Sequence, residues 1–337
     1  MPTIYDVARH AGVSIATVSK VLSGRRYVSD KTRQRVLSSV ETLQYQPNVL
    51  ARGLATDRTN LIGLVINYDP GDLFADPILL NALYGIDTEV TEHDFALLLS
   101  TARSAGDRLS AYRRLLEGYR VDGVLVETGQ GDEGIELLVQ RGYPCVAVGY
   151  TTHDLPNVHP DDYQGGRLIA QHLIELGHRR FGVISGPNFN PPAMLARMRG
   201  FSDVLAGAGL SWDPGRAVHG NFRVDSGYLA TAELMQLNPL PTALFAFNDR
   251  MAFGAMQWLR EHGYQVPGDI SVAGFDDVAD AAHSSPALTT VHFSSSDIGR
   301  RAAAMLFDLI SGKTDDKTRE VTLPVELICR QSTCPAE

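Results

Sequence analysis

The sequence predicts a chain of two different parts, a small all-α segment of about sixty residues and a larger α/β body built on parallel sheets. In the first sixty residues, apolar side chains recur at helical spacing between glycine stops. From Asn60 onward, short apolar runs alternate with helical patterns, which is typical of parallel strands covered by helices on both faces. The 337 residues, 44% apolar and 20% charged, provide enough chain for two or three globular domains.

Three helices are expected in the first part, over residues 4–11, 15–22 and about 30–43. Thr3 and Asp6 have the spacing of a capping box, and Gly12 provides the positive φ that a tight turn needs. Ser14 and Ser29 are expected to cap the second and third helices, because a serine oxygen accepts a hydrogen bond from the first turn. Two helices joined by a short glycine-containing turn form a helix-turn-helix, whose second helix enters the major groove of DNA.

The net charge of −9 is distributed unevenly along the chain. Residues 1–60 contain nine basic and four acidic side chains, so this segment carries +5 and the remainder −14. A basic head on an acidic body can bind phosphates locally. A solvated surface with chance asymmetry remains an alternative, so charge alone does not establish DNA binding.

The cysteines and the N-terminus favour a cytoplasmic location. Cys145, Cys329 and Cys334 are too few for a disulfide framework, and Cys145 lies in an apolar run typical of a core. Asp6, Arg9 and His10 interrupt the region where a signal peptide needs an apolar stretch. The longest apolar runs have about six residues, far short of the ~20 that span a bilayer.

The body is expected to alternate strands and helices. Strands are expected at 61–66, 95–99, 123–127, 145–149, 181–185, 243–247 and 270–274, and helices near 77–92, 106–117, 133–141, 163–176, 195–208, 224–237 and 249–262. Two doubly wound parallel sheets of about six strands fit this length. Ligands of such sheets bind outside the carboxyl ends of the strands, so a cleft there is the expected pocket.

The N-terminal segment closely resembles the lactose-repressor family of bacterial transcription regulators. The matching motifs are Thr3-Ile4-Tyr5-Asp6-Val7-Ala8, Ala11-Gly12-Val13-Ser14, Thr17-Val18-Ser19-Lys20-Val21, Val28-Ser29, Thr32-Arg33, Tyr45-Gln46-Pro47-Asn48 and Ala51-Arg52-Gly53-Leu54. The resemblance continues through nearly the whole chain. It implies a helix-turn-helix domain at 1–46, a hinge helix and linker at 47–59, and an effector-binding and dimerisation domain at 60–337.

The same resemblance implies how the body is divided. Two subdomains like those of periplasmic sugar-binding proteins are expected, with the chain crossing between them three times. The N-subdomain would comprise about 60–159 and 293–320, and the C-subdomain about 160–292 and 321–337.

The resemblance also assigns residues to DNA. Ile15, Ala16 and Lys20 take the base-reading positions of the second helix, and Lys20 can donate to guanine O6 and N7. Side chains able to donate to phosphate oxygens would contact the backbone: Tyr5, Ser14, Thr17, Ser19, Tyr27, Ser29, Thr32 and Tyr45. Asn48 would cap a hinge helix containing Ala51, and Leu54 would wedge a base step in the minor groove.

Seven residues are expected at the effector site. By the resemblance, Arg197 and its partner Asp276 bind the effector, Asn248 lies at a strand end, and Phe222 and Phe74 provide aromatic rings. Three positions depart from the family pattern. Glu127 stands where some relatives have asparagine, Phe293 where many have glutamine, and Gly149 where many have aspartate.

Two other classes of protein were weighed. Gly129-Gln130-Gly131-Asp132-Glu133-Gly134 is a GxGxxG motif, which suggests an NAD-dependent dehydrogenase. Asp132 and Glu133 would place two negative charges beside a pyrophosphate, and the motif is not in the first βα unit, so an enzyme is disfavoured. A free-standing solute-binding protein is disfavoured by the helix-turn-helix head and by the lack of a signal peptide.

The expected function is therefore that of a transcription regulator, most simply a repressor, which binds an inverted-repeat operator as a homodimer. A small molecule, expected to be a sugar, would control it from the cleft. No cofactor, metal site or membrane contact is expected. The end of the sequence has no leucine heptads, so a C-terminal coiled-coil tetramer is not expected.

Overall fold

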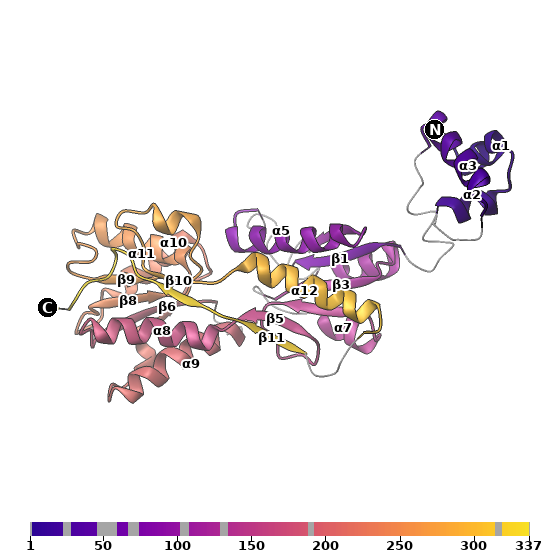
Figure 1. Ribbon diagram of the computed structural model, residues 1–337. Helices are drawn as coiled ribbons and strands as arrows, with labels where there is room; N and C mark the ends of the chain where they lie inside the picture. The colour runs from indigo at the N-terminus through magenta and orange to yellow at the C-terminus, as the bar shows by residue number, and fades with distance from the viewer. Residues whose placement is uncertain are drawn as a thin grey trace. The chain divides into compact units, whose positions relative to one another are not determined.

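The computed structural model describes residues 2–22, 28–45, 59–66, 74–101, 108–128, 134–187, 192–313 and 319–336. The chain divides into two compact units, Met1–Asn60 and Leu61–Glu337. Figure 1 shows short helices in the first unit and assemblies of strands and helices in the second. The expected fold class is confirmed by these elements.

The first unit contains α1 (Ile4–Ala11), α2 (Ile15–Leu22) and α3 (Asp30–Thr42). Their core is formed by Val7, Val18 and Val36, each fully buried. Thr3 and Asp6 form the expected capping box, and the Thr17 amide donates to Ser14 Oγ at 3.2 Å. Ser29 precedes α3 but makes no side-chain capping hydrogen bond, because its hydroxyl pairs with Thr32 Oγ1 at 3.0 Å instead.

The first sheet of the body has six parallel strands in the order β11-β5-β4-β3-β1-β2. Their bounds are β1 Leu61–Ile66, β2 Ala96–Thr101, β3 Gly123–Glu127, β4 Cys145–Val148, β5 Asn157–Pro160 and β11 Glu320–Leu323. Helices cover this sheet: α5 (Pro77–Glu92), α6 (Arg108–Arg113) with the π-helix η2 (Arg114–Tyr119), α7 (Ile135–Gln140) and α12 (Ser295–Ile310).

Alternate residues of β1 pack into different core clusters. Leu64 and Ile66 belong to the cluster that includes Ile86 of α5 and Ala302 of α12, whereas Val65 packs with Leu115 of η2. Because successive strand residues point to opposite faces, a strand that is apolar throughout must be covered on both sides. This explains the uninterrupted apolar run of β1.

The second sheet has four parallel strands in the order β7-β6-β8-β9. They are β6 (Phe181–Ser185), β7 (Ala217–His219), β8 (Ala243–Ala246) and β9 (Ser271–Ala273). Figure 1 shows α8 (Asp162–Glu175) and α9 (Pro192–Gly207) on one side of this sheet, and α10 (Val224–Leu234) and α11 (Asp249–Glu261) on the other. Two further strands, β10 (Thr290–His292) and β12 (Glu326–Ile328), pair antiparallel.

The strands therefore number six, four and two in the described residues, where two sheets of about six were expected. The unexpected strands β5, β7, β10, β11 and β12 have three or four residues each, too few to show an alternating pattern. The subdomain boundary expected between 320 and 321 falls inside β11. The pairing of Val321 and Leu323 with β5 places these residues in the first sheet.

The chain passes between the two sheets at three short segments: from β5 to α8, from β10 to α12, and from β11 to β12. Each link contains only one or two residues outside its flanking elements.

Three helix pairs of the body cross with their backbones in close contact, and each crossing is made by two glycines. A Cβ on Gly166 of α8 would lie 2.1 Å from the Arg197 carbonyl oxygen of α9, and one on Gly200 of α9 would lie 2.0 Å from the Tyr163 carbonyl oxygen of α8. The same reciprocal arrangement joins α5 to α12 through Gly85 and Gly299, and α10 to α11 through Gly227 and Gly254. No other residue type fits these six positions without moving a helix.

A Gly200→Ala substitution tests this packing. The added methyl group would meet a backbone atom that cannot rotate away, so we expect a loss of about 1–3 kcal/mol or more in the free energy of unfolding. Gly207→Ala is the matched control on the same helix, because nothing lies within 4 Å of its Cβ position. Denaturant unfolding should show the control to be neutral or stabilised by up to about 1 kcal/mol. Equal stabilities of the two variants would contradict the close crossing.

Candidate functional site

A cavity of about 150 Å³ lies in the body, lined by residues from both sheets and their helices. Its charged lining residues are Asp76, Glu127, Asp162, Arg197 and Asp276. Phe222, Phe293, Tyr150 and Met194 are among its larger apolar lining residues. Aromatic and apolar surface with a few polar groups suits a small ligand with both hydroxyl groups and C–H faces.

The polar groups of this cavity follow the ends of parallel strands. Glu127 is the last residue of β3, Asp162 follows β5, Asn248 follows β8 and Asp276 follows β9. Side chains at the carboxyl ends of parallel strands converge at one edge of a sheet, which is where α/β proteins bind ligands. The topology therefore gathers residues that are more than 100 positions apart in the sequence.

Arg197 is held from three directions. Its Nε donates to Asp162 Oδ1 at 2.7 Å, and its NH1 group donates to the Phe247 carbonyl oxygen. Its guanidinium carbon lies 3.5 Å from the ring centroid of Phe275, an ideal distance for a cation–π contact. Arg197 and Asp162 are both buried, so each charge depends on the other for compensation.

Asp276 presents a carboxylate that the described residues leave without a hydrogen bond or ion pair; only its backbone is bonded, to Val291. Its φ of 111° is a left-handed value that a non-glycine residue rarely adopts. Burial raises the pKa of Asp276 well above its ordinary value, and the carboxylates of Asp249, Asp76 and Asp162 raise it further against the opposing effect of Arg197.

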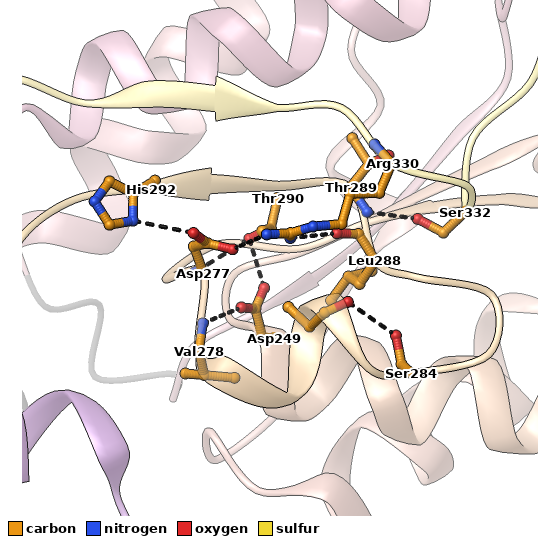
Figure 2. Close-up of polar contacts among 11 residues, drawn as sticks. Asp249, Asp277, Val278, Ser284, Leu288, Thr289, Thr290, His292, Arg330 and Ser332 are labelled. Carbon is orange, nitrogen blue, oxygen red and sulfur yellow. Dashed lines mark hydrogen bonds and ion pairs between the residues drawn. The ribbon is translucent and has the colours of Figure 1, made fainter.

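A polar network supports the turn that carries Asp276 (Figure 2). The neighbouring Asp277 accepts from Arg330 NH2 at 2.6 Å and lies 3.1 Å from His292 Nδ1. Asp249, at the start of α11, accepts from the Val278 amide at 2.9 Å and from the Thr290 hydroxyl at 2.6 Å. The network thus fixes both sides of the turn, which keeps Asp276 in its unfavourable conformation.

Asn248 stabilises the backbone around the cavity through two hydrogen bonds. Its Oδ1 accepts from the Met251 amide and caps α11, and its Nδ2 donates to the Phe222 carbonyl oxygen at 3.0 Å. Phe222 has a φ of 67°, so this hydrogen bond stabilises a second left-handed residue at the site. Asn248 therefore orients the aromatic ring as well as lining the cavity.

Six of the seven residues expected at the effector site line this cavity: Glu127, Arg197, Phe222, Asn248, Asp276 and Phe293. Phe74 is not among the lining residues and its side chain is 70% exposed. The Arg197 side chain pairs with Asp162, where the sequence analysis had named Asp276 as its partner. Gly149 also lines the cavity, and a Cβ there would lie 2.4 Å from Thr128 Oγ1, so an aspartate would not fit without a shift.

Asp76 and Asp162 were missed by sequence reasoning. Asp76 caps α5 by accepting from the Ile78 amide at 3.0 Å, so it looks like an ordinary helix cap. Asp162 follows Asp161, which caps α8 by accepting from Gln164. Two aspartates after a strand were the available signal: the first caps the helix, and the second is then placed at the strand end.

The first unit exposes the residues expected to read DNA. Ile15, Ala16 and Lys20 are exposed on α2, while Val18 and Val21 on its other side are buried. Of the residues expected at the DNA backbone, Tyr5, Ser14, Ser19 and Ser29 are exposed, and Thr17, Thr32 and Tyr45 are half-buried. Tyr27 and the hinge residues Asn48, Ala51 and Leu54 lie outside the described residues, as does Gly24.

Other kinds of site find little support in the described part of the chain. No group of three or more His, Cys, Asp or Glu side chains there is arranged to hold a metal ion. None of its helices is both long and apolar enough to cross a membrane. The GxGxxG motif falls outside the described residues except for Gly134. Cys145 is buried, and burial raises its pKa to about 11, as expected of a core thiol.

A helix-turn-helix unit followed by a two-sheet body with a ligand-sized cavity is the architecture of a ligand-controlled transcription regulator. Residues 3–48 match the profile of bacterial regulatory proteins of the lacI family, and residues 170–333 match that of the periplasmic binding protein-like domain. The chain belongs to the LacI family.

Its relatives include two groups of curated regulators. The transcriptional regulator CelR of Thermobifida fusca is 36% identical over 338 residues, covering 98% of each chain. The transcriptional repressor PurR of Mannheimia succiniciproducens is 34% identical over 336 residues, again covering 98% of each.

Two solved structures show the same fold over the full length. A CelR–cellobiose complex has a TM-score of 0.75 at 34% identity, covering 98% of this chain and 100% of the other. The lac repressor dimer bound to operator and the anti-inducer ONPF has a TM-score of 0.87 at 28% identity, covering 99% of each chain.

Asp249 should make the stability of the body depend on pH. Burial raises its pKa from 3.8 to about 7, so between these values the folded protein binds a proton that the unfolded chain releases. This group's contribution to stability is therefore present at low pH and lost as the pH rises toward 7. At about 1.4 kcal/mol per pKa unit, the loss amounts to at most about 4 kcal/mol.

Asp249→Asn tests this, because an amide can still accept from Val278 and donate to Thr290 without ionising. Urea unfolding between pH 5 and 8 should give a flatter stability profile for the variant than for the unsubstituted protein. Asp280→Asn, on an exposed residue, is the control. Parallel profiles for Asp249→Asn and the unsubstituted protein would show that Asp249 is ionised throughout.

Proposed function

We propose that this protein is a repressor that binds an inverted-repeat operator as a homodimer and is controlled by a small polyhydroxylated effector, a sugar, in the cavity of its body. The observation that carries the proposal is the carboxylate of Asp276, which makes no hydrogen bond or ion pair among the described residues and lines the cavity with Arg197 and aromatic rings. The lac repressor structure contains a dimer on its operator, and the CelR structure contains cellobiose. A repressor of this kind would act in the bacterial cytoplasm, on the nucleoid.

We assign each proposed role to one continuous segment of the chain. Residues 1–46 bind DNA, 47–59 form a hinge and linker, and 60–337 bind the effector and form the dimer. On α2, Lys20 reads a base edge, while Ile15 and Ala16 make apolar contacts. The hydroxyl and phenol groups of Tyr5, Ser14, Thr17, Ser19, Tyr27, Ser29, Thr32 and Tyr45 serve the DNA backbone. Asn48, Ala51 and Leu54 form the minor-groove hinge.

In the cavity, we assign Arg197 and Asp276 to the hydroxyl groups of the effector and Phe222 and Phe293 to its C–H faces. Glu127 and Asn248 add polar contacts from opposite sides. Effector binding controls DNA binding only if the two states of the body bind the effector unequally. The three short links between the sheets allow such states to differ by a change in closure.

The proposal is tested by selecting bound fragments from a pool of random DNA duplexes with the purified protein. We expect an inverted repeat whose half-sites reflect the two-fold symmetry of a dimer. Recovery of a single unrepeated site, or of DNA without any common sequence, would contradict the proposed operator.

Lys20→Ala should relax the preference at one base pair of each half-site, at a cost of about 1–3 kcal/mol on the preferred sequence. Lys31→Ala is the control, because Lys31 is a second exposed lysine, on α3. It should weaken binding to all sequences alike or leave binding unchanged. Binding is measured on a series of single-base variants of the selected operator. An equal loss on every sequence for Lys20→Ala would show that Lys20 contacts only phosphate.

Asp276→Asn should abolish the response to the effector while leaving effector-free DNA binding and folding intact. Asparagine tolerates left-handed backbone angles, and the side chain makes no hydrogen bond that the substitution would remove. Asp280→Asn, on an exposed residue of the same loop region, is the matched control. Operator binding is measured with and without effector. An unchanged effector response in Asp276→Asn would remove Asp276 from the site.

A further inference from the structure

Outside the effector cavity, a thiol, an imidazole and two hydroxyl groups form a chain of contacts. Cys329 Sγ lies 3.7 Å from His172 Nδ1, and His172 Nε2 lies 2.9 Å from Thr333 Oγ1. Thr333 Oγ1 lies 3.1 Å from Thr289 Oγ1. None of these four residues lines the cavity. A nucleophile within hydrogen-bond reach of a base, which is itself oriented by a third group, is the arrangement of an activated nucleophile.

The fold brings these four residues together from three parts of the chain. His172 lies on α8, Thr289 directly precedes β10, and Cys329 directly follows β12, the antiparallel partner of β10. The Arg330 amide donates to Thr289 Oγ1 at 2.9 Å, which fixes the backbone beside the thiol. Tertiary packing therefore holds the base against the thiol, and the sequence spacing gives no sign of this contact.

One assignment of the protons satisfies the whole chain of contacts. Burial lowers the pKa of His172 below its ordinary value, against the opposing effect of Glu175, so the imidazole is neutral at pH 7. A neutral imidazole has one donor and one acceptor nitrogen. When Nε2–H donates to Thr333, whose hydroxyl donates to Thr289, the remaining nitrogen Nδ1 accepts the proton of the Cys329 thiol.

Neither of the other two cysteines has a base in contact with its sulfur among the described residues. Cys145 is buried in the core, and burial raises its pKa to about 11. The Cys334 thiol donates to the carbonyl oxygens of Pro267 at 3.3 Å and Pro335 at 3.4 Å, which hold the proton on sulfur. Cys329 is exposed, so it combines access from solvent with a neighbouring base. The thiolate is the reactive form of cysteine, and a base beside the thiol helps to produce it.

We propose that Cys329 is a site of reversible thiolation by low-molecular-weight disulfides and that His172 is its base. The inference does not depend on the proposed repressor function. It assigns a covalent modification to a surface of the body that is separate from the effector cavity.

The step is a thiol–disulfide exchange. The S–H bond of Cys329 breaks as its proton passes to His172 Nδ1, and the sulfur forms a bond to one sulfur of the small disulfide. The S–S bond of the disulfide breaks, and the departing sulfur keeps the electron pair and takes the proton from His172. Cys329 is thereby oxidised to a mixed disulfide, and one half of the small disulfide is reduced to a thiol. An excess of a small thiol reverses the exchange.

The modified sulfur would lie next to the network that supports the cavity. Arg330, the residue after Cys329, donates to Asp277 at 2.6 Å and to the Leu288 carbonyl oxygen at 2.8 Å (Figure 2). Asp277 adjoins Asp276, which lines the cavity. An adduct on Cys329 would therefore be one residue away from the ion pair that holds this turn.

The experiment compares the full-length protein in its folded state with the same protein in concentrated urea. Bis(2-hydroxyethyl) disulfide is the probe, because it is uncharged and Arg330 cannot attract it. Free thiols are blocked with N-ethylmaleimide at intervals, and trypsin, which cleaves after Arg330, separates Cys329 from Cys334 for mass spectrometry. We expect Cys329 to react at least about tenfold faster in the folded protein than in urea, within what a positioned base contributes. Exposure alone cannot give this result, because the thiol is at least as exposed in the unfolded chain.

His172→Gln separates the base from the geometry around it. The glutamine amide can still donate to Thr333 but cannot take the thiol proton, so the rate at Cys329 in the folded protein should fall at least about tenfold. His283→Gln, on an exposed histidine outside this cluster, is the matched control and should leave the rate unchanged. Cys334 should react no faster in the folded protein than in urea.

A folded-state rate at Cys329 that is equal to or below the rate in urea overturns the inference. A rate that is unchanged in folded His172→Gln also overturns it. If His172→Gln does not fold, the comparison of folded and unfolded states of the unsubstituted protein decides the proposal on its own.

Discussion

The glycine-paired helix crossings are the constraint on which the body depends. At each crossing a glycine from either helix faces a backbone carbonyl of the other, at Cβ positions about 2 Å from oxygen. Contact at this distance leaves no room for side chains to adjust, so the relative position of the two helices is fixed to a fraction of an ångström. Two of these crossings, α8 with α9 and α5 with α12, fix the relative positions of cavity walls, because all four helices contribute lining residues.

The crossing of α8 and α9 also positions the charged side chains of the cavity. The carbonyl group that faces Gly166 belongs to Arg197, so the contact that positions the backbone also positions the guanidinium. Asp162 begins α8, and the same crossing brings it to 2.7 Å from Arg197. The ion pair is buried and would be costly if either partner were displaced. The helix contact therefore holds each charge beside its partner, and this pairing compensates for the water that both side chains lose on burial.

Two other residues of the site have strained backbone conformations. Asp276 and Phe222 both occupy left-handed conformations, which non-glycine residues adopt only when their surroundings hold them there. For Asp276 the surroundings are the network of Asp249, Asp277 and Arg330, and for Phe222 the hydrogen bond from Asn248. The support of Asp276 comes from residues that do not line the cavity, whereas Asn248 both supports Phe222 and lines the cavity.

Much of the fold could be predicted from the sequence, for physical reasons that apply element by element. Leu61–Ile66 is long and wholly apolar, so it could only be a strand buried on both faces, and Thr3 with Asp6 specifies a helix start by local hydrogen bonding. Thr290–His292 and Ala217–His219 have three residues each and acquire their strand geometry only from neighbours far along the chain. Helix α12 went unpredicted although it packs along α5, because its surroundings are made by residues some 200 positions earlier.

Some residues of the candidate site could also be predicted from the sequence, and others could not. Arg197, Phe222, Asn248 and Asp276 could be named because they stand at positions that a family resemblance marks. Asp162 could not be named, because local spacing explains only the cap made by its neighbour Asp161. The exposure of Phe74 could not be inferred either, since aromatic character suggests burial whether a ring lies in a cavity or outside it.

The links between the sheets explain why this cavity suits control of a distant function. Pro160, Asp162, Phe293 and Ser295 all line the cavity, and each belongs to or directly flanks a segment that joins the two sheets. A ligand therefore touches the very segments about which the two sheets could close.

One of these links is additionally fixed by a histidine. His159 Nδ1 lies 2.7 Å from the Pro160 carbonyl oxygen, and its Nε2 lies 2.9 Å from the Glu320 carboxylate on β11. The second contact joins β5 to β11 through side chains, in addition to the backbone pairing of the two strands. Two of the three links therefore leave neighbouring, cross-connected strands, so a change in closure would involve both links together. A ligand that contacts these links can act as an effector only by binding one state of closure more tightly than another, because it shifts populations between states that already exist.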